Sequence, residues 1–401
     1  MKIKNHYYLV LTGILNFISF TNFSQSWEQI QDFPGSPRDD GSSFTIGNKS
    51  YCGLGMDAGF SCKSDFYCFD ASTNSWTTSP SLPTNQERQY ATSCSWNNKG
   101  FVFGGIKCDG TFLNDLWIFD PISESWSNGI ALPAEGRAGS SHFILGDTLY
   151  VVGGKNTTGI TTDVWAFDFT SNSWTQKTAY PGDGIWRGIS FSRNDSGYAG
   201  LGRNNLNNQT ELNTRIYSYN SLVNNWTLMP DLGFTPRCYS GTAQKDSLVL
   251  LFGGLDGTNT ILDSFDRIDI DNWNRFSLLN FSSSPRKGGM CFLANEMFYV
   301  TTGVSLAARL DETWRIDNVL KKIEIEQSEF GLFPNPSNDW CKIEFTTAMS
   351  GEIYLNSMDG RLIKQFTIEN STYFDFNTND FAEGTYIVKL GSISKLLVIQ
   401  K

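Results

Sequence analysis

Histidine is almost absent from this 401-residue sequence, which contains only His6 and His142. His6 lies in an N-terminal segment that we expect to be removed, so a Ser-His-Asp triad would have to use His142. Zinc sites and other metal sites built on several imidazoles are excluded on the same ground. His142 sits in GSSHFILG, where apolar and polar residues alternate, so we expect it to be a packed strand residue.

Long hydrophobic runs and excess positive charge are also lacking. No charge-free apolar run long enough for a membrane helix occurs after the N-terminus. The net charge of −10 repels phosphates and argues against a nucleic-acid partner. The sequence has no phosphate-binding glycine loop, no GxSxG nucleophile motif and no CxxC zinc spacing. We therefore expect no metal and no cofactor.

Residues 1–25 have the pattern of an export signal. Two lysines in MKIKNHYY precede the apolar stretch LVLTGILNFISF, and small polar residues follow, which places cleavage near Gln25. The alternative is a membrane anchor, for which an apolar stretch of about 12 to 14 residues is short. Export would bring the eight cysteines into an oxidising compartment, where disulfides form.

Aromatic residues and glycine are abundant instead, and they recur with a fixed period. The segment FVFGGIKCDGTFLNDLWIFDPISESW at residues 101–126 returns, loosened, as YVVGGKNTTGITTDVWAFDFTSNSW at residues 150–174. Successive members of the arginine set are 49 or 50 residues apart. Three residue types share this period: Gly55, Gly105, Gly154, Gly202, Gly254 and Gly303; Trp27, Trp76, Trp126, Trp174, Trp226 and Trp273; and Arg38, Arg88, Arg137, Arg187, Arg237 and Arg286.

Each unit is predicted to form four short strands. In the second unit these are ATSCSW, FVFGG, DLWIFD and SWSN, separated by segments rich in turn formers. The glycines would let strand ends crowd near an axis, and the tryptophan would bury its ring between neighbouring sheets. The aspartate that closes the third strand would cap the following turn, as at Asp70, Asp120 and Asp168.

This pattern resembles the kelch repeat, and six copies cover about residues 27–317. The resemblance implies an all-β, six-bladed propeller over residues 26–320. It weakens in units 1 and 4, which read YCGLG and YAGLG, and unit 5 has a shifted third strand and a shortened turn. Unit 6 lacks a fourth strand, so we expect SWEQI near the N-terminus to complete the last blade and close the ring.

The last 70 or so residues alternate with period two, which predicts a small antiparallel β-sandwich over residues 327–401. They resemble the C-terminal type A sorting domain of the type IX secretion system of Bacteroidetes. The matching features are PNP at residues 334–336, Asp359 with Gly360, GTYIVKL at residues 384–390, and the basic end at Lys395 and Lys401. This resemblance implies contact with the secretion machinery and a secreted or surface-held product. The alternative is an ordinary small β domain.

The six repeat arginines are the candidate ligand-binding residues. By the kelch resemblance they enter the innermost strands, so their guanidinium groups would ring the channel mouth and suit carboxylate or sulfate groups. The alternative is that each arginine pairs with a carboxylate or backbone carbonyls of its blade. Asp65, Asp115 and Asp163 recur at the start of third strands, which argues for a structural role. Glu87 and Glu135 are a less favoured acid/base pair.

Two cysteines of neighbouring units, Cys62 and Cys108, fall in loops between second and third strands. These loops would lie on one face, so a disulfide between them is geometrically feasible. Cys94 and Cys291 fall in first strands and are expected to be small buried residues.

The expected function is binding of an extracellular protein or glycan through one propeller face. The loop GRNNLNNQTELNT of unit 4 is the longest candidate contact. The alternative is a carbohydrate-active enzyme, an epimerase, mutarotase or lyase, since sialic acid mutarotases are kelch propellers that handle an acidic sugar; this is analogy at the level of fold. A scaffold without a small ligand is a third reading. A copper site like that of galactose oxidase, whose central domain is similar, needs more than one histidine and is excluded.

Overall fold

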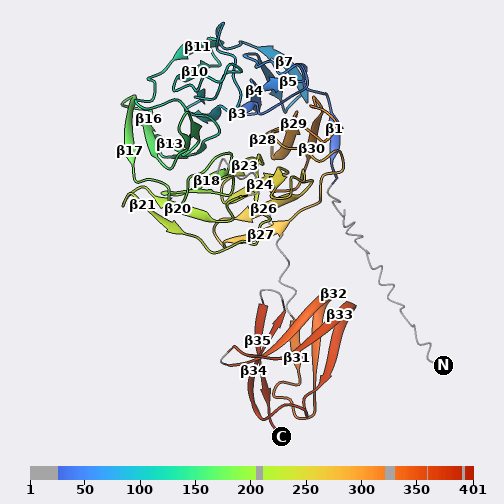
Figure 1. Cartoon of the computed structure of the whole chain (residues 1–401). Coiled ribbons are helices and arrows are strands. Elements are labelled where there is room, and N and C mark those ends of the chain that lie inside the picture. The colour runs from blue at the N-terminus through green and yellow to red at the C-terminus, as the bar shows by residue number, and fades with distance from the viewer. Residues whose placement is uncertain (1–25, 205–210, 321–329, 359, 391–392) are drawn as a thin grey trace, which may run out of the picture. The chain divides into compact units, whose positions relative to one another are not determined.

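The computed structural model describes residues 26–204, 211–320, 330–358, 360–390 and 393–401. The chain divides between Leu320 and Lys321 into two compact units. The described parts of both units are built from β-strands (Figure 1). The expected export signal, residues 1–25, lies outside the described residues.

The first unit is a propeller of six four-stranded antiparallel sheets, which confirms the predicted fold class. Figure 1 looks along its axis, with β3, β18, β23 and β28 near the centre and β7, β17, β21 and β27 at the rim. The strands of the first five blades, from inside to outside, are β3 (Ser42–Ile46), β4 (Lys49–Gly53), β6 (Phe66–Asp70) and β7 (Ser75–Ser79); β8 (Thr92–Trp96), β9 (Lys99–Phe103), β10 (Leu116–Asp120) and β11 (Ser125–Asn128); β12 (Ser141–Leu145), β13 (Thr148–Val152), β16 (Val164–Asp168) and β17 (Ser173–Lys177); β18 (Ile189–Arg193), β19 (Ser196–Gly200), β20 (Ile216–Asn220) and β21 (Asn225–Leu228); and β23 (Gly241–Lys245), β24 (Leu248–Phe252), β26 (Phe265–Asp269) and β27 (Asn274–Ser277).

The sixth blade combines both ends of the repeat region. Its inner strands are β28 (Met290–Ala294), β29 (Met297–Thr301) and β30 (Thr313–Ile316), and its outer strand is β1 (Glu28–Ile30). β1 pairs antiparallel with β30, from Glu28 opposite Arg315 to Ile30 opposite Thr313. The chain therefore closes its own ring, and no blade is left with an uncovered face.

Aromatic and aliphatic side chains fill each boundary between blades. The propeller contains six hydrophobic clusters among its described residues, and each joins two neighbouring blades. Between blades 1 and 2, for example, Phe44 and Tyr51 stack with ring centroids 5.2 Å apart, and Tyr51 meets Phe119 at 4.9 Å. The sheets are thus apolar on both faces, which explains the high aromatic content.

The repeat tryptophans join each blade to the one before it. Every indole N–H donates to a backbone carbonyl just after the outer strand of the preceding blade, at distances of 2.8–3.1 Å. The acceptors for Trp27, Trp76, Trp126, Trp174, Trp226 and Trp273 are Leu279, Gln31, Pro80, Ile130, Thr178 and Pro230, respectively. Six equivalent bonds therefore run around the rim.

The fifth blade departs from the predicted register. Trp273 lies in the turn before β27, with φ of 50°, whereas the tryptophans of blades 1 to 4 lie inside the outer strand. Arg275 occupies the strand position instead, opposite Ile268. The expected shortening of this turn is wrong, because Asp269 pairs with Asn274 across a turn of the same length as in blades 1 to 4. Trp273 occupies the last position of that turn, so its ring approaches Tyr198 from the turn, at 5.5 Å between centroids.

The repeat glycines all have positive φ, between 76° and 107°. Each donates its N–H to the carbonyl at the repeat-arginine position of the next blade, as Gly55 does to Arg88 at 2.9 Å. A Cβ on Gly55 would lie 2.4 Å from the Asp39 carbonyl oxygen. The glycines are therefore required both by backbone conformation and by close approach.

Short two-stranded pairs accompany three blades on the loops between second and third strands. They are β2 (Arg38–Asp39) with β5 (Met56–Asp57), β14 (Lys155–Asn156) with β15 (Gly159–Ile160), and β22 (Arg237–Cys238) with β25 (Leu255–Asp256). The first and third pairs hold the loop before the innermost strand against the loop of the same blade, whereas β14 and β15 form a hairpin within one loop.

The second unit is a small antiparallel β-domain. It contains β31 (Phe330–Phe333), β32 (Trp340–Ser357), β33 (Leu362–Asn377), β34 (Gly384–Leu390) and β35 (Ile393–Ile399). β32 pairs with β31 through its first part and with β34 through its last part, and the register with β33 shifts between Glu344 and Met349. One apolar core, including Phe330, Ile353 and Leu397, packs between these parts.

None of the residues that the structure describes forms a helix long and apolar enough to cross a membrane.

Trp27 offers a test of ring closure. Its ring is 8% exposed and contacts Phe252, Phe265, Phe281 and Phe298. We expect Trp27→Ala to lower the free energy of unfolding by about 3–5 kcal/mol, because a large buried ring is lost. The matched control is Trp174→Ala, at a half-buried site. Urea unfolding of both variants would show whether the N-terminal closure is as important as proposed; equal losses would contradict it.

Candidate functional site

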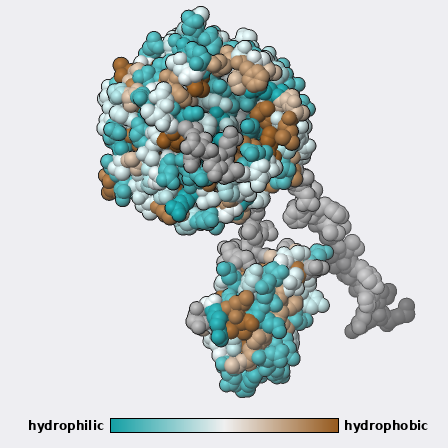
Figure 2. All heavy atoms as spheres, viewed as in Figure 1, coloured by the Kyte–Doolittle hydropathy of each residue, from teal (hydrophilic) through white to brown (hydrophobic). Residues whose placement is uncertain are grey.

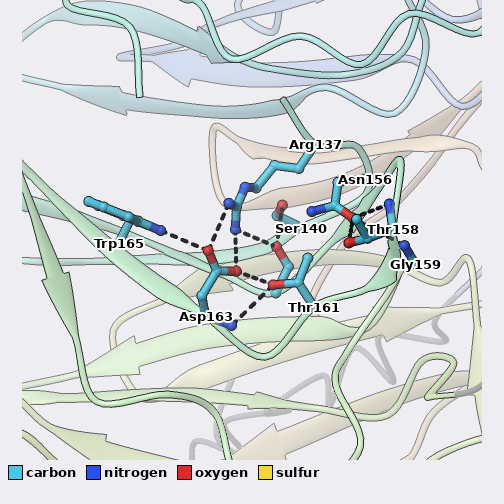
Figure 3. Close-up of polar contacts among 9 residues, drawn as sticks. Arg137, Ser140, Asn156, Thr158, Gly159, Thr161, Asp163 and Trp165 are labelled. Atoms are coloured by element: carbon cyan, nitrogen blue, oxygen red, sulfur yellow. Dashed lines mark hydrogen bonds and ion pairs between the residues drawn. The ribbon is translucent and has the colours of Figure 1, made fainter. Parts of the chain in front are cut away.

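Five of the six repeat arginines are buried inside their own blades. Arg38, Arg88, Arg137, Arg237 and Arg286 are between 0% and 2% exposed. Arg88 donates to both carboxylate oxygens of Asp115, at 2.6 and 3.0 Å, and Arg137 does so to Asp163, at 2.6 and 2.8 Å. Figure 3 shows the Arg137 fork facing Asp163, with Trp165 donating to the same carboxylate. Arg38 pairs with Asp65 in the same way.

The remaining two pairs use other partners at the equivalent position. Arg286 donates to Glu312 at 2.6 Å, and Arg237 donates to the hydroxyl of Ser264 at 2.6 Å, with Asp266 at 3.6 Å. These contacts correct the expectation of six exposed cations at the channel mouth. A carboxylate just before the third strand takes up the guanidinium in four blades, and the Ser264 hydroxyl does so in blade 5, so these five arginines stabilise blades.

The charge of these pairs is retained inside the blade. Burial favours the neutral form of Asp163, but hydrogen bonds from Arg137 and Thr161 outweigh it and hold the pKa of this carboxyl below its usual value. Trp117 likewise donates to Asp115 at 2.7 Å. Asp65, Asp115 and Asp163 are thus structural.

The fourth blade breaks this pattern, and Arg187 is not an equivalent of the other arginines. Gly154 donates its N–H to the carbonyl of Ile185, which therefore occupies the repeat-arginine position. The position just before the third strand, which carries a carboxylate in blades 1, 2, 3 and 6, is held by Arg215, whose carbonyl accepts from the Leu201 N–H. Arg187 lies two residues beyond Ile185, and its even spacing in the sequence concealed this offset.

Arg187 instead belongs to a closed ring of backbone hydrogen bonds just before the innermost strands. Each ring member donates its N–H to the carbonyl of the member in the preceding blade, at 2.8–3.2 Å, and all six have φ between 54° and 64°. The members, from blade 1 to blade 6, are Asp40, Tyr90, Gly139, Arg187, Tyr239 and Gly288. We call this set the mouth ring.

The Arg187 side chain lies across the mouth ring. Its guanidinium carbon is 3.4 Å from the ring centroid of Tyr90, 3.8 Å from that of Tyr239 and 4.1 Å from that of Trp186. Tyr90 and Tyr239 come from blades 2 and 5, on opposite sides of the channel, so the guanidinium spans the opening. Such contacts are attractive because aromatic faces carry negative partial charge.

Asp40 stands opposite Arg187 in the mouth ring. Burial raises the pKa of Asp40 to about 7; the Asp39 carboxylate acts in the same direction, while Arg187 and a hydrogen bond from Tyr90 oppose it. Burial and the Asp40 charge also raise the pKa of Tyr90. The mouth thus contains a carboxyl that titrates near neutral pH.

Further cations gather around the same rings. Lys155 and Arg203 lie 5.5 and 5.8 Å from the Trp186 ring, and Lys287 lies 4.6 Å from the Tyr239 ring. Several buried donors have no hydrogen-bond partner among the described residues: Trp186 Nε1, Arg187 Nε and Nη1, and Arg203 Nε. Leaving a buried donor without a hydrogen-bond partner costs free energy. We call Asp40, Tyr90, Trp186, Arg187, Arg203 and Tyr239, with Lys155 and Lys287, the mouth cluster.

Sequence reasoning found only Arg187 of this cluster. The others fall outside the three repeated residue types, because the mouth ring position accepts aspartate, tyrosine, glycine or arginine. A usable signal existed in Tyr90 and Tyr239, which stand two residues after Arg88 and Arg237. Aligning the units on the residue two positions after the repeat arginine would have found these two tyrosines.

The structure also places the remaining predicted residues. Cys62 and Cys108 form a disulfide between blades 1 and 2, with Cα atoms 5.6 Å apart, and Cys94 and Cys291 are buried thiols. Glu135 accepts a hydrogen bond from Thr157. The aspartates that close third strands accept the backbone N–H two residues later in the turn, at 2.8–2.9 Å, as expected of caps: Asp70, Asp120 and Asp168.

Residues 14–184 match the family described as KLHDC2/KLHL20/DRC7 Kelch-repeats domain, and residues 331–401 match the secretion system C-terminal sorting domain. The protein is a kelch-repeat propeller with a C-terminal sorting domain. Among solved structures, the chain is similar to YjhT, at 16% identity and a TM-score of 0.59, over 71% of this chain and 95% of that one. This likeness concerns the fold alone. No curated protein matches the chain.

The arginine pairs of this kelch propeller can be tested by stability. We expect Arg88→Met to lower the free energy of unfolding by about 3–5 kcal/mol, because Asp115 is left without its partner. Arg187→Met should cost clearly less, since Arg187 is part-exposed and forms no ion pair with any residue that the structure describes. Tryptophan fluorescence during urea unfolding reports on this unit, which holds all tryptophans except Trp340. Equal losses in both variants would contradict the distinction.

Asp40 predicts a pH dependence. The pKa of Asp40 in the folded state, about 7, lies above the ordinary value of 3.8. The contribution of Asp40 to the free energy of unfolding is therefore fully present below pH 4 and is lost as the pH rises through 7. The free energy of unfolding of the wild type, minus that of Asp40→Asn, should therefore fall between about pH 4 and pH 7. Denaturant titrations across this range would measure it. Parallel profiles for the two proteins would show that Asp40 titrates normally.

Proposed function

We propose that this protein is exported by the type IX secretion system and binds a carboxylate-bearing saccharide outside the cell through its mouth cluster. The C-terminal sorting domain supports the secreted or surface location. In this proposal residues 1–25 act as the signal peptide, and the propeller over residues 26–320 is the part that works outside the cell.

The single observation that carries the ligand class is the position of Arg187 among three aromatic rings. Aromatic faces pack against the apolar faces of sugar rings, and a guanidinium binds a carboxylate through two parallel hydrogen bonds. The mouth cluster contains both the aromatic rings and the guanidinium group, in direct contact with one another. The unpaired donors of Trp186 and Arg203 would gain acceptors if ligand oxygens reached them after a shift of the Arg187 side chain.

Charge supports the same ligand class. The protein carries a net charge of −10, yet Lys155, Arg187, Arg203 and Lys287 converge on the mouth. A local excess of cations on an acidic protein attracts anionic ligands to that place. Figure 2 shows a propeller surface that is mostly hydrophilic or weakly polar in this view, with small, separate hydrophobic patches, which suits a polar ligand better than a large apolar one.

Binding is favoured over catalysis because the mouth ring closes around the channel and Arg187 spans it. An acid–base reaction on the same saccharide, as in an epimerase or mutarotase, is the second candidate. The observation in its favour is the Asp40 carboxyl, with a pKa of about 7, next to Tyr90 and across from Arg187. A group that titrates near the working pH is what general acid–base chemistry requires.

Calorimetric titration with glucuronic and galacturonic acid, against glucose and galactose, tests this proposal. We expect the acids to bind and Arg187→Gln to weaken them by about tenfold or more, the loss expected for a charge-assisted bidentate contact. Arg193→Gln is the matched control, because Arg193 ends the same inner strand at its far end and pairs with Asp271. No binding of either acid, or equal binding of the acids by the two variants, would refute the proposal.

A further inference from the structure

The central channel below the mouth ring is a cavity distinct from the mouth cluster. Its volume is about 590 Å³, and its wall is formed by the six innermost strands, β3, β8, β12, β18, β23 and β28. The lining begins at Gly41, Gly188 and Gly289, each one residue beyond a member of the mouth ring. This volume falls in the range of small-molecule sites.

The channel wall is polar but uncharged. Among the described residues that line it there is no aspartate, glutamate, lysine or arginine. Strand alternation turns Ile144, Cys291 and Leu293 to the channel, together with hydroxyl groups, one amide and one imidazole: Ser43, Thr45, Ser93, Ser95, Ser190, Ser192, Thr242, Gln244 and His142. A wall of this kind disfavours an ion, since no opposite charge compensates its loss of water.

The hydroxyl protons of the wall are in part already used between blades. Ser43 donates to the carbonyl of Cys291 at 3.1 Å, and Ser93 donates to the carbonyl of Ser43 at 2.8 Å. A hydroxyl has one proton, so what these serines can still offer is lone pairs. They can therefore accept hydrogen bonds from a ligand but cannot give any.

His142 adds a further acceptor. Burial lowers its pKa to about 4, while a hydrogen bond with the backbone of Ser93 acts in the opposite direction, so the imidazole is neutral at physiological pH. One nitrogen of a neutral imidazole carries a proton and the other accepts. The channel therefore offers acceptors at Ser43, Ser93 and His142, which match the hydroxyl donors of a polyhydroxylated molecule.

The end of the channel away from the mouth ring provides an approach. A second hollow of about 250 Å³ shares Thr45 and Ser95 with the channel and is also lined by Trp96, Asn97 and Asn98. The Trp96 ring is held by stacking on Phe169, with centroids 4.5 Å apart. A fixed indole beside amide groups is a suitable platform for a sugar ring.

We infer that the channel is a second binding site, which takes a neutral polyhydroxylated ligand of monosaccharide or disaccharide size from the end at Thr45 and Ser95. The ligand's hydroxyls donate to the serine hydroxyls and to His142. This site does not depend on the mouth cluster or on the acidic saccharide proposed there.

Imidazole NMR of the full-length protein labelled on histidine tests the inference. The sequence has only two histidines, and we expect His142 to be the one whose resonances keep their neutral-form positions down to about pH 5. Glucose, galactose, maltose and sorbitol are the probes, with glucuronate and ammonium chloride as comparisons. We expect at least one neutral probe to shift the His142 resonances in a saturable manner at millimolar concentration.

Two variants locate the site. Ser95→Leu fills the channel without removing a side-chain hydrogen bond between described residues, so it should weaken binding of the neutral probe at least fivefold. Arg187→Gln should leave that binding unchanged. The inference is overturned if no neutral probe moves His142, if ammonium alone does, or if Arg187→Gln abolishes the effect. Loss of acid binding in Arg187→Gln, with the neutral effect intact, separates this site from the mouth cluster.

Discussion

Closure of the ring is the constraint on which the rest of this propeller depends. Each blade is a sheet with apolar side chains on both faces, so it is stable only where a neighbour covers each face. Six blades in a closed ring meet that condition for every face. The N-terminal strand β1 completes the ring beside β30, and the tryptophan N–H bonds repeat the connection around the rim.

The buried arginine pairs serve the same end at the inner side of each blade. An arginine from the loop before the first strand and a carboxylate before the third strand neutralise one another, with the guanidinium buried and the carboxylate partly exposed. Such a pair is poor at binding ligands because its hydrogen-bonding capacity is already used. Blade 4 lacks the pair, since Ile185 and Arg215 occupy its positions, and it is this blade that supplies Trp186, Arg187 and Arg203 to the mouth cluster.

The proposed binding sites depend on positions whose residue type differs from blade to blade. Positions that repeat in all blades hold blades together, whereas the mouth ring position varies from aspartate to glycine around the channel. Glycine at positions 139 and 288 leaves space for neighbouring side chains. A Cβ on Gly139, for example, would come within 2.7 Å of Trp186 Nε1. Tyrosine, arginine and aspartate at the other positions then occupy the opening. A symmetric scaffold thereby presents an asymmetric surface.

The amino-acid sequence by itself determined the period of about 50, hence the six blades, the all-β class and the C-terminal domain, because glycine, tryptophan and arginine recur for local reasons of backbone conformation and packing. It could not reveal that Arg187 is two residues out of register with Arg137, because that shift preserves the even spacing of the arginines. Nor could it place Trp273 in the turn before the outer strand. Only the tertiary structure decided which arginines are buried, since Arg88 and Asp115 meet through a fold that joins distant loops. It also brought Asp40, Tyr90 and Tyr239 around Arg187, because ring closure places residues of opposite blades side by side across a narrow channel.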